Sequence, residues 1–283
     1  EYGGTTRLDG LDFGEGGKLN VTHGYLEVEG RLAVGEVGAE LNIDNAGQFW
    51  TNGYADKDLL DINAAGGRFA NTGLFSGTSD LDVSDNAQAI LASDDADFLL
   101  GAGSRLTLTG DDTRVGFDGD QGGTGVLLMS DLSELNFIAE DNGLSTIREF
   151  YSGHYDDDGA GIQSGVNLGM TALTLDLSDT NGAARSHTLI EVDELIGSFG
   201  GINVLGLGTD RDAMLEVNYD NDYVSLYLGE AGSGSGVISL ETIGDETNAQ
   251  DDAALWDALT NGHGLYSDDP VEDIPIEEDL LEL

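Results

Sequence analysis

Short apolar pairs with one residue between them recur along much of the chain. The series begins at Leu11-x-Phe13 and Leu19-x-Val21 and continues as far as Leu135-x-Phe137. Alternation with a period of two predicts short β-strands with one buried face. Turn-forming stretches such as "GEGG", "SDNA" and "GDQGGTG" lie between the pairs. The chain is therefore expected to be an all-β protein with many short strands.

Many short, evenly spaced strands are typical of a sandwich, a barrel, a propeller or a β-solenoid. The chain has 43 glycines and only 2 prolines. Its turns are rich in Gly, Asn and Asp, which tolerate the left-handed backbone needed at a tight solenoid corner. We predict a β-solenoid, in which each coil buries its inward residues against the coils on either side. A large β-sandwich or jelly roll is the alternative.

The pattern divides the chain into a solenoid domain at 1–240 and a C-terminal extension at 241–283. Residues 139–165 interrupt the apolar pairs and are predicted to form a lateral loop. The stretch "TNAQDDAALWDALTNG" (247–262) predicts one short helix with Thr247 or Asn248 as its cap. Residues 267–283 form an acidic tail. This tail either lies on the body or docks on a neighbouring subunit by adding a strand to an exposed edge.

Residues 170–228 resemble the last coils of autotransporter passenger domains and related bacterial surface β-helix proteins. The matching stretches are "LTLDLS", "HTLIEVDELIGSF", "INVLGLG" and "LEVNYDNDYVSLYL". The resemblance implies a right-handed parallel β-helix whose final rungs cap the fold. The sequence departs from that family after Leu240, where there is no room for the membrane β-barrel that exports a true autotransporter, and we expect that the barrel was either cut off or never present.

The charge of the chain restricts its partners. There are 55 Asp and Glu against 10 Lys and Arg, for a formal net charge of -45. Such a field repels nucleic acids and anionic lipids. It favours divalent cations, a salty medium or a basic partner. No apolar run approaches the length of a membrane span. The absence of Cys and the richness in Asp and Gly indicate a secreted protein of the bacterial cell surface.

Asp-rich turns are candidate calcium sites. Ca²⁺ prefers six to eight oxygen ligands, and Asp residues on a glycine turn supply both carboxylate and backbone oxygens. The candidate turns are "HYDDDGAG", "FDGDQGG", "YDNDY" and "SDDAD", and their aspartates also have a simpler role as turn caps. The predicted metal ligands are Asp118, Asp120, Asp156, Asp157, Asp158, Asp220 and Asp222.

Catalytic motifs are largely missing. The sequence contains no G-x-S-x-G elbow, H-E-x-x-H zinc motif, P-loop or Rossmann fingerprint. A β-helix polysaccharide lyase would need calcium-binding carboxylates beside an Arg or Lys base. Two places bring such residues together, Arg148 with 156–158 and Arg114 with 118–120. A glycosidase would need two carboxylates at a set separation, which the sequence does not reveal.

We therefore expect a non-enzymatic extracellular structural protein, stabilised by calcium. It would be an adhesin passenger or the subunit of a filament or surface lattice. Its expected partners are further copies of itself or other surface proteins, through the C-terminal tail, with polysaccharide as an additional ligand. A polysaccharide lyase or hydrolase and a carbohydrate-binding module are the alternatives.

Overall fold

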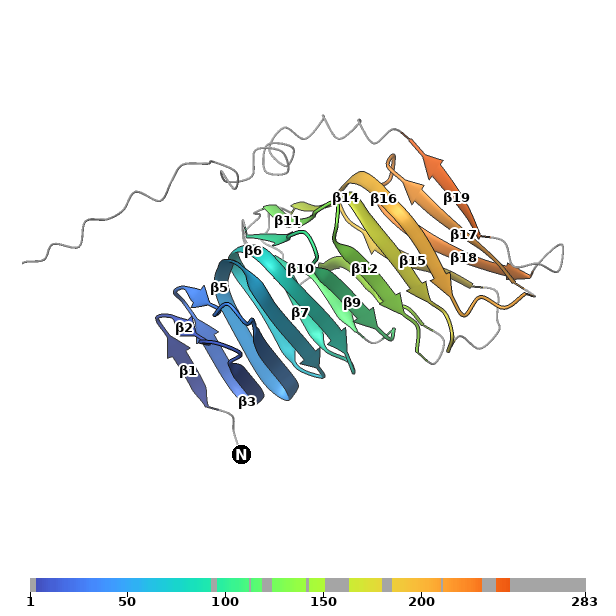
Figure 1. Ribbon diagram of the computed structural model, residues 1–283. Coiled ribbons are helices and arrows are strands. Elements are labelled where there is room, and N and C mark those ends of the chain that lie inside the picture. The colour runs from blue at the N-terminus through green and yellow to red at the C-terminus, as the bar shows by residue number, and fades with distance from the viewer. Residues whose placement is uncertain are drawn as a thin grey trace, which may run out of the picture.

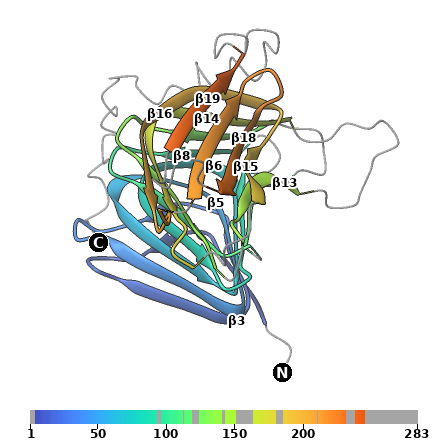
Figure 2. The same cartoon turned by 90° about the vertical axis from the view of Figure 1, so that its right-hand side faces the viewer.

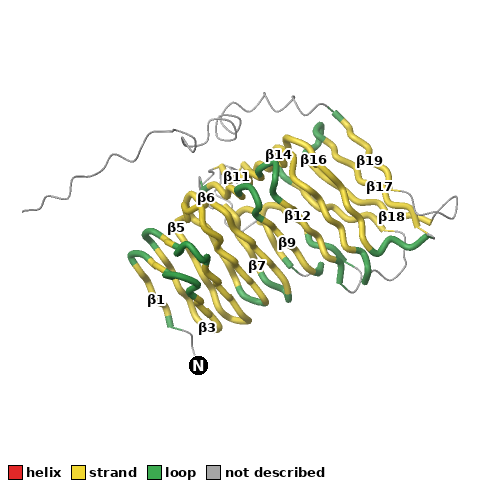
Figure 3. Tube along the Cα trace, in the orientation of Figure 1, coloured by secondary structure: helices red, strands yellow, loops and turns green. Residues whose placement is uncertain are grey.

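The computed structural model describes residues 4–92, 96–111, 113–118, 124–140, 143–150, 163–179, 185–209, 211–230 and 238–244. Every regular element in these ranges is a β-strand (Figure 3). In order they are β1 (Thr5–Leu8), β2 (Leu11–Asp12), β3 (Lys18–Val28), β4 (Leu32–Ala33), β5 (Ala39–Ala65), β6 (Arg68–Ser84), β7 (Gln88–Ala92), β8 (Asp97–Leu100), β9 (Arg105–Thr109), β10 (Arg114–Asp118), β11 (Thr124–Met129), β12 (Glu134–Ile138), β13 (Thr146–Phe150), β14 (Gln163–Asp176), β15 (Arg185–Glu191), β16 (Glu194–Leu205), β17 (Arg211–Asn218), β18 (Tyr223–Glu230) and β19 (Ile238–Ile243).

The strands form a solenoid-like stack. Seventeen of them belong to one sheet, which is parallel along most of its length, and β2 and β4 form a small second pair. The strands follow one another along the stack in chain order (Figure 1), and an end-on view shows that they surround a common interior (Figure 2). The predicted all-β, solenoid-like class is therefore confirmed. Within the described ranges, no helix is long and apolar enough to cross a membrane.

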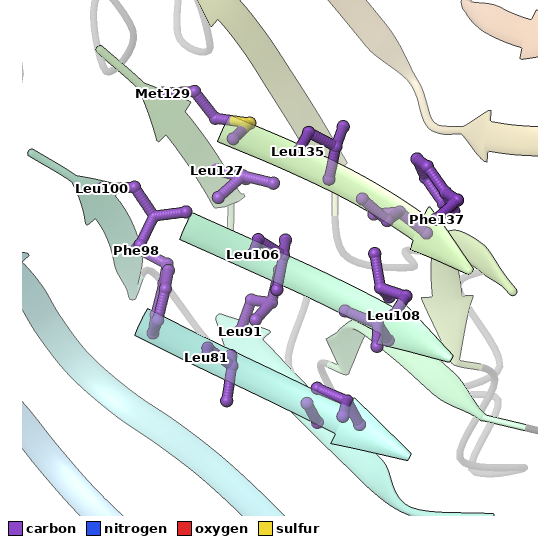
Figure 4. Packing of buried hydrophobic residues seen from close by; sticks show 14 of the residues in the cluster. Leu81, Leu91, Phe98, Leu100, Leu106, Leu108, Leu127, Met129, Leu135 and Phe137 are labelled. Carbon is purple, nitrogen blue, oxygen red and sulfur yellow. The ribbon is translucent and has the colours of Figure 1, made fainter. Parts of the chain in front are cut away.

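The apolar pairs of the sequence become rows of stacked side chains. Leu81 pairs in register with Leu106, and Leu106 with Leu135, so each buries its side chain against the next rung (Figure 4). Two further rows run beside it, one from β5 to β15 and one from β5 to β16. The three rows are Ile62, Leu81, Leu106, Leu135, Leu173 and Ile202; Phe49, Phe69, Ala89, Val115, Ile147 and Ile190; and Tyr54, Phe75, Phe98, Leu127, Val166 and Leu195.

Aromatic side chains reinforce the middle of this core. Phe75 and Phe98 stack face to face with ring centroids 4.3 Å apart, and both side chains are fully buried. Phe69 presents its ring edge-on to both of them, at 6.2 Å. Each such side chain removes a large apolar area from water, which stabilises the fold by roughly 1.5–3 kcal/mol. The core is therefore continuous from rung to rung.

The strands are longer than the sequence predicts, because the chain stays extended through several corners. β5 contains 27 residues and passes through a full turn of the stack. Asn42 and Asn63, which both lie in β5, are joined by a side-chain hydrogen bond of 3.2 Å. Elsewhere the corners use left-handed residues, as the turn composition predicts: Asp85 and Asn86 have φ angles of 55° and 65°.

The topology changes at the C-terminal end of the described chain. β17 and β18 form an antiparallel hairpin, and β18 also pairs antiparallel with β15. β19 returns parallel to β17, and it exposes about half of the Ile238 and Leu240 side chains.

Three predicted segments lie wholly or partly outside the described residues. Within the predicted lateral loop at 139–165, the structure describes β13, which pairs with β10 and β15 and so belongs to the sheet. Residues 141–142 and 151–162 of that loop are outside the described ranges. The predicted helix at 247–262 and the acidic tail at 267–283 are also outside them.

Candidate functional site: an arginine-lined cleft

A cleft of about 750 Å³ runs along one side of the stack, over the strands that contain the Phe69 row. The parallel register builds one edge of this cleft from equivalent positions of successive rungs. Arg68 of β6 pairs with Gln88 of β7, and Gln88 pairs with Arg114 of β10. Arg148 lies one rung further along, in β13. Three of the ten basic residues of the chain therefore line one surface.

Neighbouring residues fix the position of the Arg68 side chain and of the Arg148 backbone. The guanidinium carbon of Arg68 lies 5.0 Å from the centre of the Trp50 ring, within the range of a cation–π interaction. Arg148 pairs in register with Gly116 of β10, where an added Cβ would lie 1.7 Å from the Arg148 carbonyl oxygen. Only glycine allows β10 and β13 to approach each other so closely at this point.

The other end of the cleft is acidic. Glu149 follows Arg148 in β13, and Glu191, Asp193 and Asn221 complete this end. The Ser164 hydroxyl donates a hydrogen bond of 2.6 Å to Glu149, and the Ser164 backbone N–H donates one of 3.1 Å to Asp193. The cleft is thus positive over β6 to β13 and negative over β13 to β16.

The Glu149 carboxyl has a strongly altered affinity for its proton. Its pKa is raised to about 7, mainly by burial; the hydrogen bond with Asp193 and the negative charges of Asp193 and Glu191 add to the shift, and the hydrogen bond from Ser164 opposes it. The Glu149 and Asp193 carboxyls interact through a hydrogen bond. The two carboxyls of a glycosidase are instead separated by roughly 5–9 Å, so that the substrate and water fit between them. This pair does not have that arrangement.

Two of the predicted calcium ligands lie in the turn between β17 and β18. Asp222 adopts a left-handed φ of 54° and accepts a 3.0 Å hydrogen bond from the Leu195 N–H. Burial raises the pKa of this carboxyl, as do the charges of Asp193 and Asp220, while the bond from Leu195 opposes the shift. Asp222 therefore anchors the hairpin turn to the start of β16. The Asp220 backbone N–H is capped by the Asn218 side chain, at 3.2 Å.

The other predicted ligands are not brought together by the described structure. Asp118 ends β10, and only its backbone is described. Asp120, Asp156, Asp157 and Asp158 lie outside the described residues. Within the described ranges, no group of three or more His, Asp or Glu side chains is arranged to hold a metal ion.

The sequence identified only part of the cleft. Arg114 and Arg148 were singled out as candidate bases, and the structure brings both to one surface, where they also line a smaller pocket of about 250 Å³. Arg68, Glu149 and Asp193 were missed. One signal was available, since Arg68 and Arg114 each directly precede a buried residue of the same row, Phe69 and Val115.

Comparison with known proteins gives no further guide to this cleft. No protein family, no curated protein and no solved structure matches the chain.

Proposed function

We propose that the chain is a non-enzymatic structural protein of a bacterial surface, built as a right-handed parallel β-helix. In this proposal it acts outside the cell as an adhesin passenger or as the subunit of a filament or surface lattice. The observation that carries the proposal is the continuous core of three apolar rows through β5 to β16. A stack in which each rung is supported by its neighbours forms a stiff rod, and the length of the rod increases with the number of rungs.

Two further features support a structural role. The direct contact between Glu149 and Asp193 differs from the separated carboxylates that glycoside hydrolysis requires. The net charge of -45 keeps such a body soluble and suits a salty extracellular medium. Assembly would then occur through the C-terminal segment at 241–283, either with further copies or with other surface proteins.

Calcium binding by the Asp-rich turns is part of the same proposal. Clustered carboxylates repel one another, and a divalent ion removes that repulsion while adding oxygen ligation. The triplet Asp156–Asp158 is the densest group of this kind among the predicted ligands.

The experiment combines electron microscopy with thermal unfolding of the same sample, in calcium and then in EGTA at matched ionic strength. We expect elongated particles or lattices, and a melting temperature that falls by several degrees on chelation. A variant with Asn at 156–158 should lose this calcium response. A matched variant with Asn at the exposed Asp9, Asp131 and Asp179 should retain it.

The proposal has separate points of failure. Compact particles that never associate, or turnover of a polysaccharide by the purified chain, would contradict the structural role. An unchanged melting temperature in EGTA would contradict only calcium stabilisation.

A further inference from the structure

We propose that the arginine-lined cleft is a binding site for an acidic polysaccharide, a sugar chain that carries carboxylate groups and lies along the stack. The first observation is which basic side chains form ion pairs and which do not. Three basic side chains outside the cleft are neutralised by acidic partners: Arg7 pairs with Glu27 at 2.7 Å, and Lys18 and Arg105 pair with Glu40 and Asp80. Within the described residues, the Arg114 and Arg148 side chains have no ion pair or hydrogen bond.

Two unpaired guanidinium groups that line the same pocket, in a chain with an excess of carboxylates, indicate a site for an anion. Arginine presents a planar fork that binds a carboxylate through two parallel hydrogen bonds. Arg114 and Arg148 line both the large cleft and the smaller pocket beside it. They are therefore placed to act on one anionic group together.

The spacing of the arginines favours a polymer over a single small anion. Neighbouring rungs of a sheet are separated by about 4.8 Å. Arg68 and Arg114 are two rungs apart in the same column, so their backbones are roughly 10 Å apart. A ligand that uses both must carry separated negative groups along the direction of the stack, as a chain of acidic sugars does.

The acidic end of the cleft favours a sugar over an acidic peptide. Glu149, Glu191 and Asp193 supply hydrogen-bond acceptors for hydroxyl groups, Asn221 supplies a donor and an acceptor, and Phe150 supplies an apolar surface. A sugar chain presents hydroxyls between its carboxylates and fits both ends. The segment 267–283 of this chain has an acidic residue at 8 of its 17 positions and no hydroxyl after Ser267. The acidic end would repel it.

The test is calorimetric titration of the full chain with oligogalacturonate, oligomannuronate and hyaluronan oligosaccharides, in about 0.15 M NaCl to screen the overall negative charge. Maltooligosaccharide is the neutral control ligand, and a synthetic 267–283 peptide tests the alternative occupant. We expect at least one acidic oligosaccharide to bind, and R114Q/R148Q to weaken that binding by about tenfold or more. R114K/R148K should weaken it less, because the charge remains and only the fork is lost.

Arg31→Gln is the matched control, because Arg31 is exposed and lies outside the cleft. It should bind as the unaltered chain does, and circular dichroism should show all variants folded. Binding of none of the acidic oligosaccharides overturns the proposal. So does binding that R114Q/R148Q leaves unchanged, or binding of the peptide alone. The proposed structural role at the bacterial surface is tested separately by electron microscopy, so either proposal can fail without the other.

Discussion

The protonation of Glu149 couples the cleft to pH at the scale of a single residue. Burial beside Asp193 and Glu191 raises its pKa to about 7 from an ordinary value near 4.5. Between these two pH values the folded chain holds a proton that the unfolded chain has released. The stabilisation from that proton is complete at low pH and is lost as the pH rises to about 7.

Replacing this carboxyl by an amide tests the coupling. Glu149→Gln is expected to be more stable than the unaltered chain at pH 8, by about 1 kcal/mol, because solvent reaches the partly buried carboxyl and reduces the effect. The difference in the free energy of unfolding between Glu149→Gln and the unaltered chain should grow between pH 5 and pH 7.5 and then level off. Urea unfolding across this range measures it. Glu36→Gln, at an exposed turn outside the cleft, removes the same charge and is the matched control. Parallel pH profiles for the two variants would contradict the assignment.

At the scale of the elements, hydrogen-bonded side chains on successive rungs add to the backbone ladder. Asn42 donates a 2.9 Å bond to Asn20 and accepts one from Asn63, which links three rungs through β3 and β5. The central residue takes part in both bonds. Replacing Asn42 therefore removes more side-chain hydrogen bonds than replacing Asn20 or Asn63 would.

Asn42→Ala is expected to lower the free energy of unfolding by about 1–2 kcal/mol, since the side-chain hydrogen bonds to Asn20, Glu40 and Asn63 are lost. Asn203→Ala is the matched control, because the Asn203 side chain is exposed and makes no hydrogen bond among the described residues. Its unfolding free energy should change by less than about 0.5 kcal/mol. Equilibrium urea unfolding distinguishes the two. Equal effects would show that the asparagine row has no special role.

The strands themselves could be predicted from the sequence, but their pairing could not. Every apolar pair falls in or beside a strand, because period-two alternation directly reflects a half-buried strand. The partners of each strand were not predictable. Leu81, Leu106, Leu135 and Leu173 are consecutive in one row, yet they are 25, 29 and 38 residues apart. Insertions at the corners change the spacing without changing the register.

The same variation in spacing explains what was missed at the site. Arg114 and Arg148 stand out in sequence because basic residues are rare and aspartates are near. Arg68 and Asp193 join them only through the pairing of β6, β7, β10, β13 and β15, with Ser164 of β14 between Glu149 and Asp193. A cleft assembled across rungs depends on knowledge of the register. Charge counts alone do not provide it.

At the scale of the whole molecule, the dominant electrostatic effect is self-repulsion. A net charge of -45 favours the expanded chain, and added salt screens it. We expect the melting temperature to rise by roughly 5 °C between about 0.02 M and 0.5 M NaCl. Tetramethylammonium chloride at the same ionic strength should give the same rise if screening is the cause. A rise with sodium alone would indicate specific ion sites, and no rise would contradict the prediction.

The parallel stacking of rungs also determines how the molecule responds to a pull along its length. The hydrogen bonds between neighbouring strands point along the stack, so a tensile load applied at its two ends acts in the direction of those bonds. Under this load the bonds at one rung boundary separate before those at the next. The body should therefore yield in small steps and dissipate work at each one. Because each rung contacts only its neighbours, the detached turns can dock again when the tension falls.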